Sequence, residues 1–376
     1  MAGVVIAGGG PAGCACALAL RAHAPSLAVT LYEASPYDAP RVGETLPPLA
    51  RGILEHLGVW PAFLAQRHRP SYGTLAAWGS AAPHANDFMF STAGNGWHLD
   101  RSAFDAMLAR ECIGRGVDVR RGAAVTEGAR FVVDATGGAA AIARARGAQS
   151  VALDRLVCFG RFFDDAGGDP RTIVEACADG WWYTAGLPDG RRFAAFMTDS
   201  DIARSLDMSE AEAWSRAAAS LPLLGPLLRD ARPRGDVVAR AAESRRLDAA
   251  AGDGWLAAGD AASRFDPLSS QGIVKALRSG IFAAYAIGDL LTRGDDAGLR
   301  RYRAFINAEF AAYAETRAQF YAEERRWPES EFWRRRIGIG TPASSPAGPQ
   351  ASRLRLEEAA RTPPLQPPRR RRSERR

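Results

Sequence analysis

The sequence predicts an α/β protein in which a Rossmann-like dinucleotide-binding domain is interleaved with an antiparallel β-sheet substrate domain and followed by C-terminal helices. Three observations predict this class: a glycine fingerprint between an apolar strand and an alanine-rich helix, short β-rich segments in mid-chain, and two long helical segments after about residue 273. The chain has 376 residues, 47% of them hydrophobic, and can therefore bury a substantial core.

The N-terminal segment GVVIAGGGPAGCACALALRAH carries the first chemical signal. Gly8, Gly10 and Gly13 have G-x-G-x-x-G spacing: the first permits a tight turn, the second lets a pyrophosphate approach the backbone, and the third lets the helix pack on the strand. Glu33 ends the next predicted strand, 20 residues after Gly13, where a carboxylate can bind ribose hydroxyls. This order predicts a dinucleotide site.

Two later segments indicate which dinucleotide binds. The strand in ARFVVDATGG ends at Asp134 and is followed by Gly137, and it would close the sheet beside the cofactor. In GDAASRFDPLSSQG, residues 259–272, Asp260 follows a strand and a helix begins a few residues later. A carboxylate there can bind ribityl hydroxyls, and the N–H groups of a helix N-terminus suit the negative charge of a reduced flavin. We therefore expect FAD.

The middle of the chain predicts an antiparallel sheet, with strands at 155–163, 171–177, 181–187 and 191–198 and a turn at LPDG. Neighbouring side chains on a strand point to opposite faces, so some of the aromatic residues at 181–183 should face a substrate cavity while others pack in the core. The predicted substrate pocket contains Trp78, Trp181, Trp182, Tyr183 and Ser269.

The predicted domains are discontinuous. The FAD domain takes residues 1–70, 97–150 and 236–293, the substrate domain 71–96 and 151–235, the C-terminal helices 294–340, and a disordered basic tail 341–376. Residues 361–376 alone hold seven arginines and one glutamate, which accounts for the net charge of +6 and argues against nucleic-acid binding by the folded part.

The sequence shows neither an apolar run of membrane-spanning length nor a signal peptide, so we expect a cytoplasmic protein without membrane contact. The five scattered cysteines lack metal-ligand spacing and are interpreted as free thiols; no metal is expected.

Several motifs taken together resemble a known group. GGGPAG, RVGE at 41–44, LDRSAFD at 99–105, DATG and GDAASRFDP resemble the FAD-dependent monooxygenase fold of the p-hydroxybenzoate hydroxylase type. VGETLPP, AAWGS, GWHLDR, GWWYTAGLPDGR and FDPLSSQGI are similar to the flavin-dependent tryptophan halogenases, and more so to non-halogenating relatives that mature tryptophylquinone cofactors in partner enzymes. The resemblance covers roughly residues 1–330.

The resemblance implies further cofactor contacts. Arg41 and the loop residues Val42, Gly43 and Thr45 would flank the flavin, Arg101 would lie near its phosphate or ribose, and Pro267, Gly272 and Ile273 would lie along the ring. An ordinary surface ion pair is the alternative for both arginines.

The sequence also departs from the halogenase pattern. Those enzymes use a lysine in the region of residues 70–80 and a glutamate beside the serine of the FDP loop, whereas this chain has no lysine there and carries Ser269 at the acid position. Its only lysine, Lys275, is expected at an amphipathic helix position. Gly138 stands where an arginine is frequent.

We therefore expect an FAD-dependent monooxygenase that hydroxylates a tryptophan- or indole-like ring, free or carried by a peptide, through a flavin C4a-hydroperoxide formed with O2. NAD(P)H or a partner flavin reductase would supply the electrons. His98 is the candidate acid or base, with a structural hydrogen bond as the alternative, and Glu44 is either a catalytic carboxylate or a loop-positioning one. Alternative functions are a halogenase, a dehydrogenase or reductase of the geranylgeranyl reductase type, and a non-catalytic FAD-binding partner protein.

Overall fold

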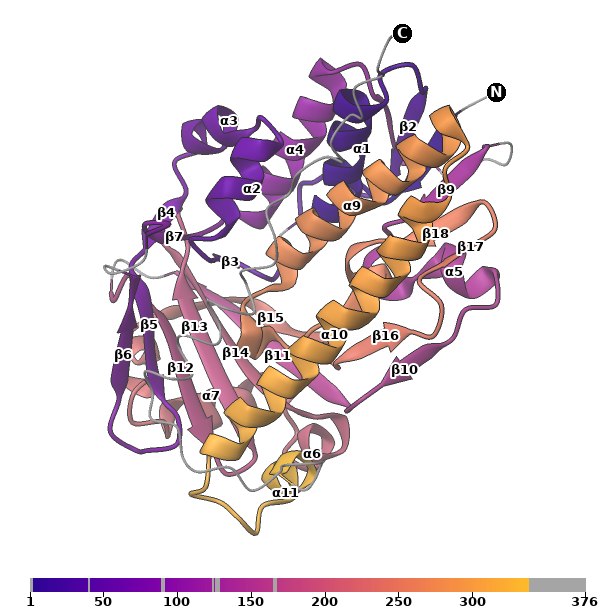
Figure 1. Ribbon diagram of the computed structural model, residues 1–376. Coiled ribbons are helices and arrows are strands. Elements are labelled where there is room, and N and C mark those ends of the chain that lie inside the picture. Colours follow the sequence, from indigo (N-terminus) through magenta and orange to yellow (C-terminus); the bar gives the residue numbers. More distant parts are fainter. Residues whose placement is uncertain are drawn as a thin grey trace, which may run out of the picture.

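The computed structural model describes residues 3–337, apart from 40, 89–91, 124, 126–128 and 165–167. The predicted basic tail, 341–376, lies outside the described residues. Two large sheets, two small three-stranded sheets and the helices that cover them make up the described part of the chain (Figure 1).

The six-stranded sheet has the order β17-β18-β9-β1-β2-β8. Its strands are β1 (Val4–Ala7), β2 (Val29–Glu33), β8 (Asp118–Arg121), β9 (Phe131–Asp134), β17 (Ala251–Gly252) and β18 (Trp255–Ala257). All pairings are parallel except β17 with β18. The apolar segment VVIA is buried throughout because helices cover this sheet, which is typical of parallel sheets.

Helix α1 (Pro11–His23) packs against helix α9 (Gly272–Arg293), as Figure 1 shows. The two backbones lie very close, because a Cβ at Gly280 would come within 2.3 Å of the Ala12 carbonyl oxygen. Helix α4 (Arg101–Gly114) lies beside α1. This packing holds the glycine-rich loop and the start of α9 at the same edge of the sheet.

The seven-stranded sheet has the order β15-β11-β14-β13-β12-β5-β6. Its strands are β5 (Gly73–Ala77), β6 (His84–Asp87), β11 (Leu156–Asp164), β12 (Thr172–Cys177), β13 (Gly180–Gly186), β14 (Arg191–Asp199) and β15 (Arg232–Ala241). The four strands predicted in mid-chain are present, and β13 and β14 form the expected hairpin. β15 remains in this sheet to Ala241, six residues beyond residue 235, which is the predicted end of the substrate domain.

Two small sheets complete the strands: β3 (Thr45–Leu46), β7 (Gly96–His98) and β4 (Arg69–Ser71), and β10 (Ser150–Ala152), β16 (Arg245–Leu247) and β19 (Ser263–Arg264). The remaining helices are α2 (Ala50–His56), α3 (Trp60–Ala65), α5 (Ala141–Ala145), α6 (Ser200–Ser205), α7 (Ala211–Ala219), α8 (Gly225–Leu228), α10 (Ala297–Glu323) and α11 (Glu331–Ile337).

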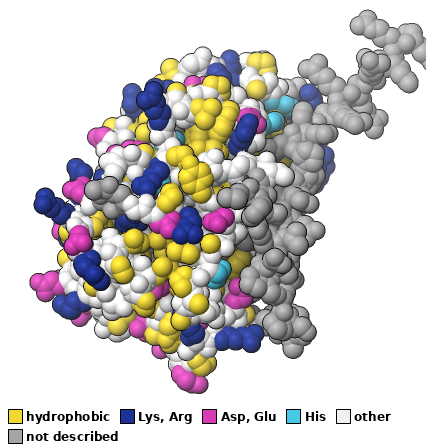
Figure 2. All heavy atoms as spheres, turned by 90° about the vertical axis from the view of Figure 1, so that its left-hand side faces the viewer, with side chains coloured by type: hydrophobic (Ala, Val, Ile, Leu, Met, Phe, Trp, Pro, Cys, Tyr) yellow, Lys and Arg dark blue, Asp and Glu magenta, His cyan; other side chains and the backbone are white. Residues whose placement is uncertain are grey.

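The C-terminal helices α10 and α11 run along the molecule from the six-stranded to the seven-stranded sheet (Figure 1). The face that carries α2, α3 and β4 to β6 shows hydrophobic atoms interspersed with charged side chains (Figure 2). None of the helices in the described part of the chain combines the length and the apolarity that a membrane span requires.

Candidate flavin and substrate site

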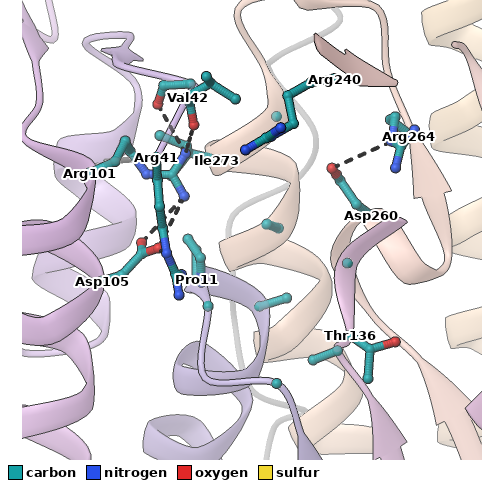
Figure 3. Close-up of a pocket in the computed structure, with 18 of the residues that line it drawn as sticks. Pro11, Arg41, Val42, Arg101, Asp105, Thr136, Arg240, Asp260, Arg264 and Ile273 are labelled. Atoms are coloured by element: carbon teal, nitrogen blue, oxygen red, sulfur yellow. Dashed lines mark hydrogen bonds and ion pairs between the residues drawn. The ribbon is translucent and has the colours of Figure 1, made fainter. Parts of the chain in front are cut away.

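A cavity of about 770 Å³ lies between the two large sheets and is lined by residues of both. Its volume falls within the ~300–1,000 Å³ typical of small-molecule sites. Arg41, Arg101 and Asp105 lie on one side of it, and Asp260 and Arg264 on the other (Figure 3). Cys158, Tyr183, Phe193, Met197 and Arg240 reach it from the seven-stranded sheet. No group of three or more His, Cys, Asp or Glu side chains in the described ranges could hold a metal ion.

The glycine-rich loop has the geometry that a dinucleotide requires. Gly8 has φ +109°, and a Cβ there would lie 2.1 Å from the Ala135 carbonyl oxygen, so only glycine fits. A Cβ at Gly13 would lie 1.9 Å from the Gly8 carbonyl oxygen, so this glycine permits the close helix packing. At Gly10 a Cβ would meet no atom within 4 Å, which leaves open space at the N-terminus of α1 for a pyrophosphate.

Glu33 ends β2 on the cavity wall and is held by several donors. Its Oε2 accepts from the Gly9 amide at 2.7 Å, and its Oε1 accepts from the Ser35 amide at 2.9 Å and from Arg41 at 3.2 Å. Each carboxylate oxygen has two lone pairs, so an acceptor site remains for a ribose hydroxyl.

Arg41 and Arg101 form a partly buried cluster with Asp105 rather than surface ion pairs. Asp105 is fully buried and lies 2.8 Å from Arg41 and 3.3 Å from Arg101. Arg101 also donates to the carbonyl oxygens of Val42 and Gly43, and its Nε is buried without a partner among the described residues. The cluster therefore fixes the flavin-flanking loop. Sequence reasoning missed Asp105, although its position four residues after Arg101 on one helix was a usable signal.

The structure does not place Asp134 at the cavity. Its buried carboxylate accepts from the amides of Thr136, Ile142 and Ala143 and from the Thr136 hydroxyl. These bonds hold the turn after β9, and this turn brings Gly137, with φ +64°, to the cavity wall. Asp134 thus shapes the site without facing it.

Asp260 faces the cavity and forms an ion pair that the sequence did not predict. Its Oδ1 lies 2.7 Å from Lys275 Nζ, and the Lys275 side chain is only 2% exposed while that of Asp260 is 42% exposed. The structure differs from the amphipathic helix position expected for Lys275, because the side chain is buried and its ammonium group pairs with this carboxylate of the segment before α9. Burial alone would raise the pKa of Asp260, but the charges of Lys275 and Arg264 outweigh it and lower the pKa.

Arg264 explains why residue 138 is a glycine. A Cβ at Gly138 would lie 1.4 Å from Arg264 Nη2, so the guanidinium group crosses the position of a side chain at 138. Arg264 lines the cavity and pairs with Glu243 at 2.8 Å. The resemblance leads one to expect an arginine at residue 138. In this chain Arg264, from the segment after Asp260, places its guanidinium group there instead.

We expect Gly138→Ala to displace Arg264 from the cavity wall and to raise the dissociation constant for FAD about tenfold, or ~1.4 kcal/mol, as for a lost charged contact. Gly138 has no left-handed φ, so alanine should not strain the backbone. FAD titration followed by fluorescence measures the change. Arg264→Ala should lower the affinity for FAD by the same factor, and the double variant should lower it no further. Wild-type affinity for FAD in Gly138→Ala would contradict this assignment.

Glu44 is a buried carboxyl group at the boundary between the two domains. It lines the cavity and is 2% exposed. Its Oε2 accepts from the Tyr183 hydroxyl at 3.2 Å, whereas Oε1 is buried without a hydrogen-bond partner among the described residues. Burial raises the pKa of Glu44 to about 7, although its own backbone amide, Arg101 and Tyr183 oppose the shift. The group therefore titrates near neutral pH.

His98 does not line the cavity; it is fully buried and lies at the end of a chain of polar contacts that begins at Glu44. From Glu44 the contacts pass through the Tyr183 hydroxyl, which lies 3.0 Å from Thr45 Oγ1. Thr45 Oγ1 in turn lies 3.5 Å from Thr172 Oγ1, and Thr172 Oγ1 lies 3.0 Å from His98 Nε2. Burial, aided by nearby arginines, lowers the pKa of His98 to about 4. The structure favours a structural hydrogen bond over an acid or base role for His98. The neutral ring bonds to Thr172 and is connected to Glu44 only through the intervening hydroxyl groups.

Three of the five predicted pocket residues pack in the core, which differs from the prediction. Trp78 and Trp181 donate to the Phe320 carbonyl and the Tyr321 hydroxyl of α10, and Trp182 stacks on Phe196. Ser269 does not line the cavity either, because its hydroxyl donates to the Asp266 carbonyl oxygen. Only Tyr183 reaches the cavity.

The other predicted cofactor residues line the same cavity. They are Val42, Gly43, Thr45, Pro267, Gly272 and Ile273. Sequence reasoning missed Asp266 beside them, which accepts from Tyr321 at 2.7 Å and from Arg317 at 3.2 Å and so connects the FDP loop to α10. The cavity therefore brings together the glycine-rich loop, Glu33, Arg41, Arg101 and Asp260, which are groups that a flavin dinucleotide could contact.

This fold and cavity resemble those of flavin-dependent monooxygenases and halogenases, and comparisons with known proteins agree. A family model described as tryptophan halogenase matches residues 3–72. LodB of Marinomonas mediterranea, described as an FAD-dependent oxidoreductase, is 29% identical over 358 residues, which are 88% of this chain and 96% of LodB.

Two solved structures extend the comparison. The flavin-dependent halogenase CmlS matches with a TM-score of 0.80 and 27% identity over 94% of this chain and 70% of CmlS. The peptidyl tryptophan dihydroxylase QhpG, essential for tryptophylquinone cofactor biogenesis, matches with a TM-score of 0.71 and 27% identity over 92% of this chain and 80% of QhpG. The resemblance and the fold class are thereby confirmed, and the chain is an FAD-dependent oxidoreductase.

Proposed function

We propose that this protein is a monooxygenase that hydroxylates an electron-rich aromatic ring, indole-like and either free or carried by a peptide. The observation that carries the proposal is the cavity between the two large sheets, in which the glycine-rich loop and the strands β11, β13 and β14 line one space. A cofactor bound at the glycine-rich loop and an aromatic substrate bound against the seven-stranded sheet would then lie next to each other. The similarity to QhpG supports an aromatic substrate within a peptide.

The residues of the chain fit the bound form of FAD. Gly8, Gly10 and the N-terminus of α1 would hold the pyrophosphate, Glu33 the ribose and Asp260 the ribityl end. When bound and reduced, FAD would supply the two electrons that activate O2, and O2 would supply the oxygen atom of the product. Phe193, Met197 and Cys158 are buried apolar walls that would exclude water and orient the ring.

Halogenation is the second candidate, because the family model and CmlS point to it. The position of Lys275 favours hydroxylation. Its ammonium group is buried, bonded to Asp260 and to the Ser263 carbonyl oxygen, and does not line the cavity. The chain's single lysine is therefore not available to position a hypohalous acid beside a substrate.

The test uses the full chain with FAD, a flavin reductase, NADH, O2, bromide and tryptophan-containing peptides. We expect products heavier by one or more oxygen atoms and no halogen isotope pattern in the mass spectrum. Oxygen-18 from labelled O2 should appear in the product. A bromide-dependent product with the bromine isotope pattern would instead establish the halogenase function, and NADH oxidation without O2 consumption would indicate a reductase.

A further inference from the structure

We infer that Glu44 and Tyr183 recognise the substrate through a ring N–H group, with Glu44 Oε1 as the acceptor, so that the substrate class is an N–H heteroaromatic such as indole or pyrrole. This inference rests on the proposed function, since it assigns the substrate of the same cavity. Its basis is an unpartnered carboxylate oxygen on an apolar wall.

The first step is the incomplete bonding of Glu44. A buried polar atom without a partner costs free energy, and nearly all such atoms in folded proteins have one. Glu44 Oε2 has the Tyr183 hydroxyl, but Oε1 has no partner of suitable geometry among the described residues. A ligand that donates a hydrogen bond would remove this deficit.

The second step is the orientation of the pair. Tyr183 donates its only proton to Glu44, so its contact with Thr45 requires the Thr45 hydroxyl to donate to the tyrosine. Burial and the neighbouring Glu44 charge raise the pKa of Tyr183 well above its ordinary value, so the phenol stays protonated. The Thr45 and Thr172 hydroxyls lie behind it, 3.5 Å apart. With its carboxyl group ionised, above a pKa of about 7, Glu44 is thus an acceptor, and a ligand must supply the donor.

The third step is the chemistry of the surrounding wall. Phe193, Met197 and Cys158 line the cavity on the sheet side and are nearly fully buried. An apolar pocket with one acceptor selects a flat apolar ring that carries one donor. On the other side Glu44 lies between Gly43 and Thr45, in the loop that would flank the flavin. The ring N–H would therefore be anchored next to the reacting ring carbon.

Such an anchor has a catalytic consequence. Attack of the ring on an electrophilic oxygen places positive charge on the ring, and the nitrogen of an indole or pyrrole shares that charge. A carboxylate bonded to the N–H stabilises this state more than the neutral ring. Glu44 would therefore both select the substrate and raise the rate.

The experiment compares indole with benzofuran, which replaces the N–H by an oxygen of similar size. Binding to the FAD-loaded protein is measured by calorimetry, without turnover. We expect indole to bind at least tenfold more tightly than benzofuran to the wild-type protein and to Glu55→Gln, a control on the exposed face of α2. Glu44→Leu should reduce the ratio to threefold or less, and Glu44→Gln, which retains a neutral acceptor, to an intermediate value.

The outcomes separate this inference from the proposed function. Equal binding of indole and benzofuran by the wild-type protein, or an unchanged ratio in Glu44→Leu, would overturn the inference while leaving hydroxylation to its own test. A clear preference for indole that Glu44 controls, together with a halogenated product, would support the inference and reject the hydroxylase. The absorbance of bound FAD verifies that each variant is folded.

Discussion

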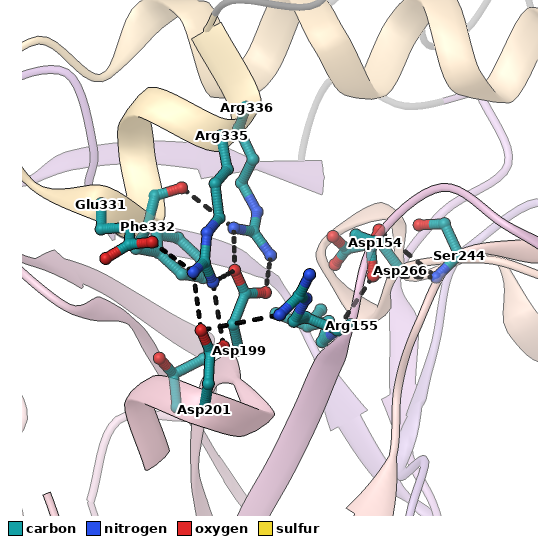
Figure 4. Close-up of polar contacts among 12 residues, drawn as sticks. Asp154, Arg155, Asp199, Asp201, Ser244, Asp266, Glu331, Phe332, Arg335 and Arg336 are labelled. Atoms are coloured by element: carbon teal, nitrogen blue, oxygen red, sulfur yellow. Dashed lines mark hydrogen bonds and ion pairs between the residues drawn. The ribbon is translucent and has the colours of Figure 1, made fainter. Parts of the chain in front are cut away.

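Replacing Asp199 with alanine is expected to lower the free energy of unfolding by about 3–5 kcal/mol, the usual loss when one partner of a buried ion pair is removed. Asp199 is 1% exposed and accepts two hydrogen bonds from Arg336 of α11, at 2.6 and 3.2 Å (Figure 4). The Arg336 side chain is 2% exposed. Without Asp199, the Phe332 carbonyl oxygen is its one remaining hydrogen-bond acceptor in the described chain.

Asp201 offers a matched control. It pairs with Arg335 at 2.6 Å, but its side chain is 37% exposed, so Asp201→Ala should cost no more than about 1 kcal/mol. Urea denaturation of both variants measures the difference. Equal losses in the two variants would show that burial of the Arg336 charge does not set the cost.

The same pair gives the protein an acid limit. Burial by itself would raise the pKa of Asp199, but hydrogen bonds from Arg336 and Arg335 outweigh it, and the pKa lies below its ordinary value. A lowered carboxyl pKa contributes stability that is present above the unfolded pKa of about 4 and is lost as the pH falls through the folded value. Wild-type stability should therefore fall below about pH 4, and Asp199→Ala should lose less over this range.

The contacts around α10 and α11 also explain where sequence reasoning failed. Trp78 and Trp181 occur in motifs that suggested a substrate pocket, yet both bond to α10, whose residues come more than 130 positions later in the chain. Trp333 of α11 packs edge-on against Trp78 at 5.3 Å between ring centroids. Spacing along a sequence carries no information about such distant partners, so an aromatic residue on a strand can be assigned to a pocket when it belongs to the core.

Features set by local backbone geometry were predictable. The glycine loop and the hairpin at LPDG follow from short spacings and occur as expected. Helices α7 and α8 do not form one continuous helix, because Pro222 between them lacks the N–H group that a continuous helix would use. The hydrogen bond between Glu44 and Tyr183 joins residues 139 positions apart in the sequence, so it required the three-dimensional structure even though both residues had been singled out.

Asp260→Ala is expected to destabilise the FAD-free protein by about 3 kcal/mol, at the lower end of the range for broken buried pairs because the carboxylate itself faces the cavity. The cost arises at Lys275, whose side chain is 2% exposed and would lose its bonded carboxylate, keeping the Ser263 carbonyl oxygen, the face of Phe265 and an electrostatic interaction with Glu309. Asp260→Ala should also bind FAD more weakly, so a measurement of cofactor affinity alone would not reveal the cause.

The double variant Asp260→Ala/Lys275→Met separates the two effects. Methionine fills the space of the lysine stem without its charge, so denaturation of the FAD-free double variant should recover most of the lost stability. FAD affinity should stay low, because a methionine cannot replace a carboxylate that binds ribityl hydroxyls. If the affinity recovers together with the stability, Asp260 holds Lys275 and not the cofactor. If the stability does not recover, the buried ammonium group is not what makes Asp260 necessary.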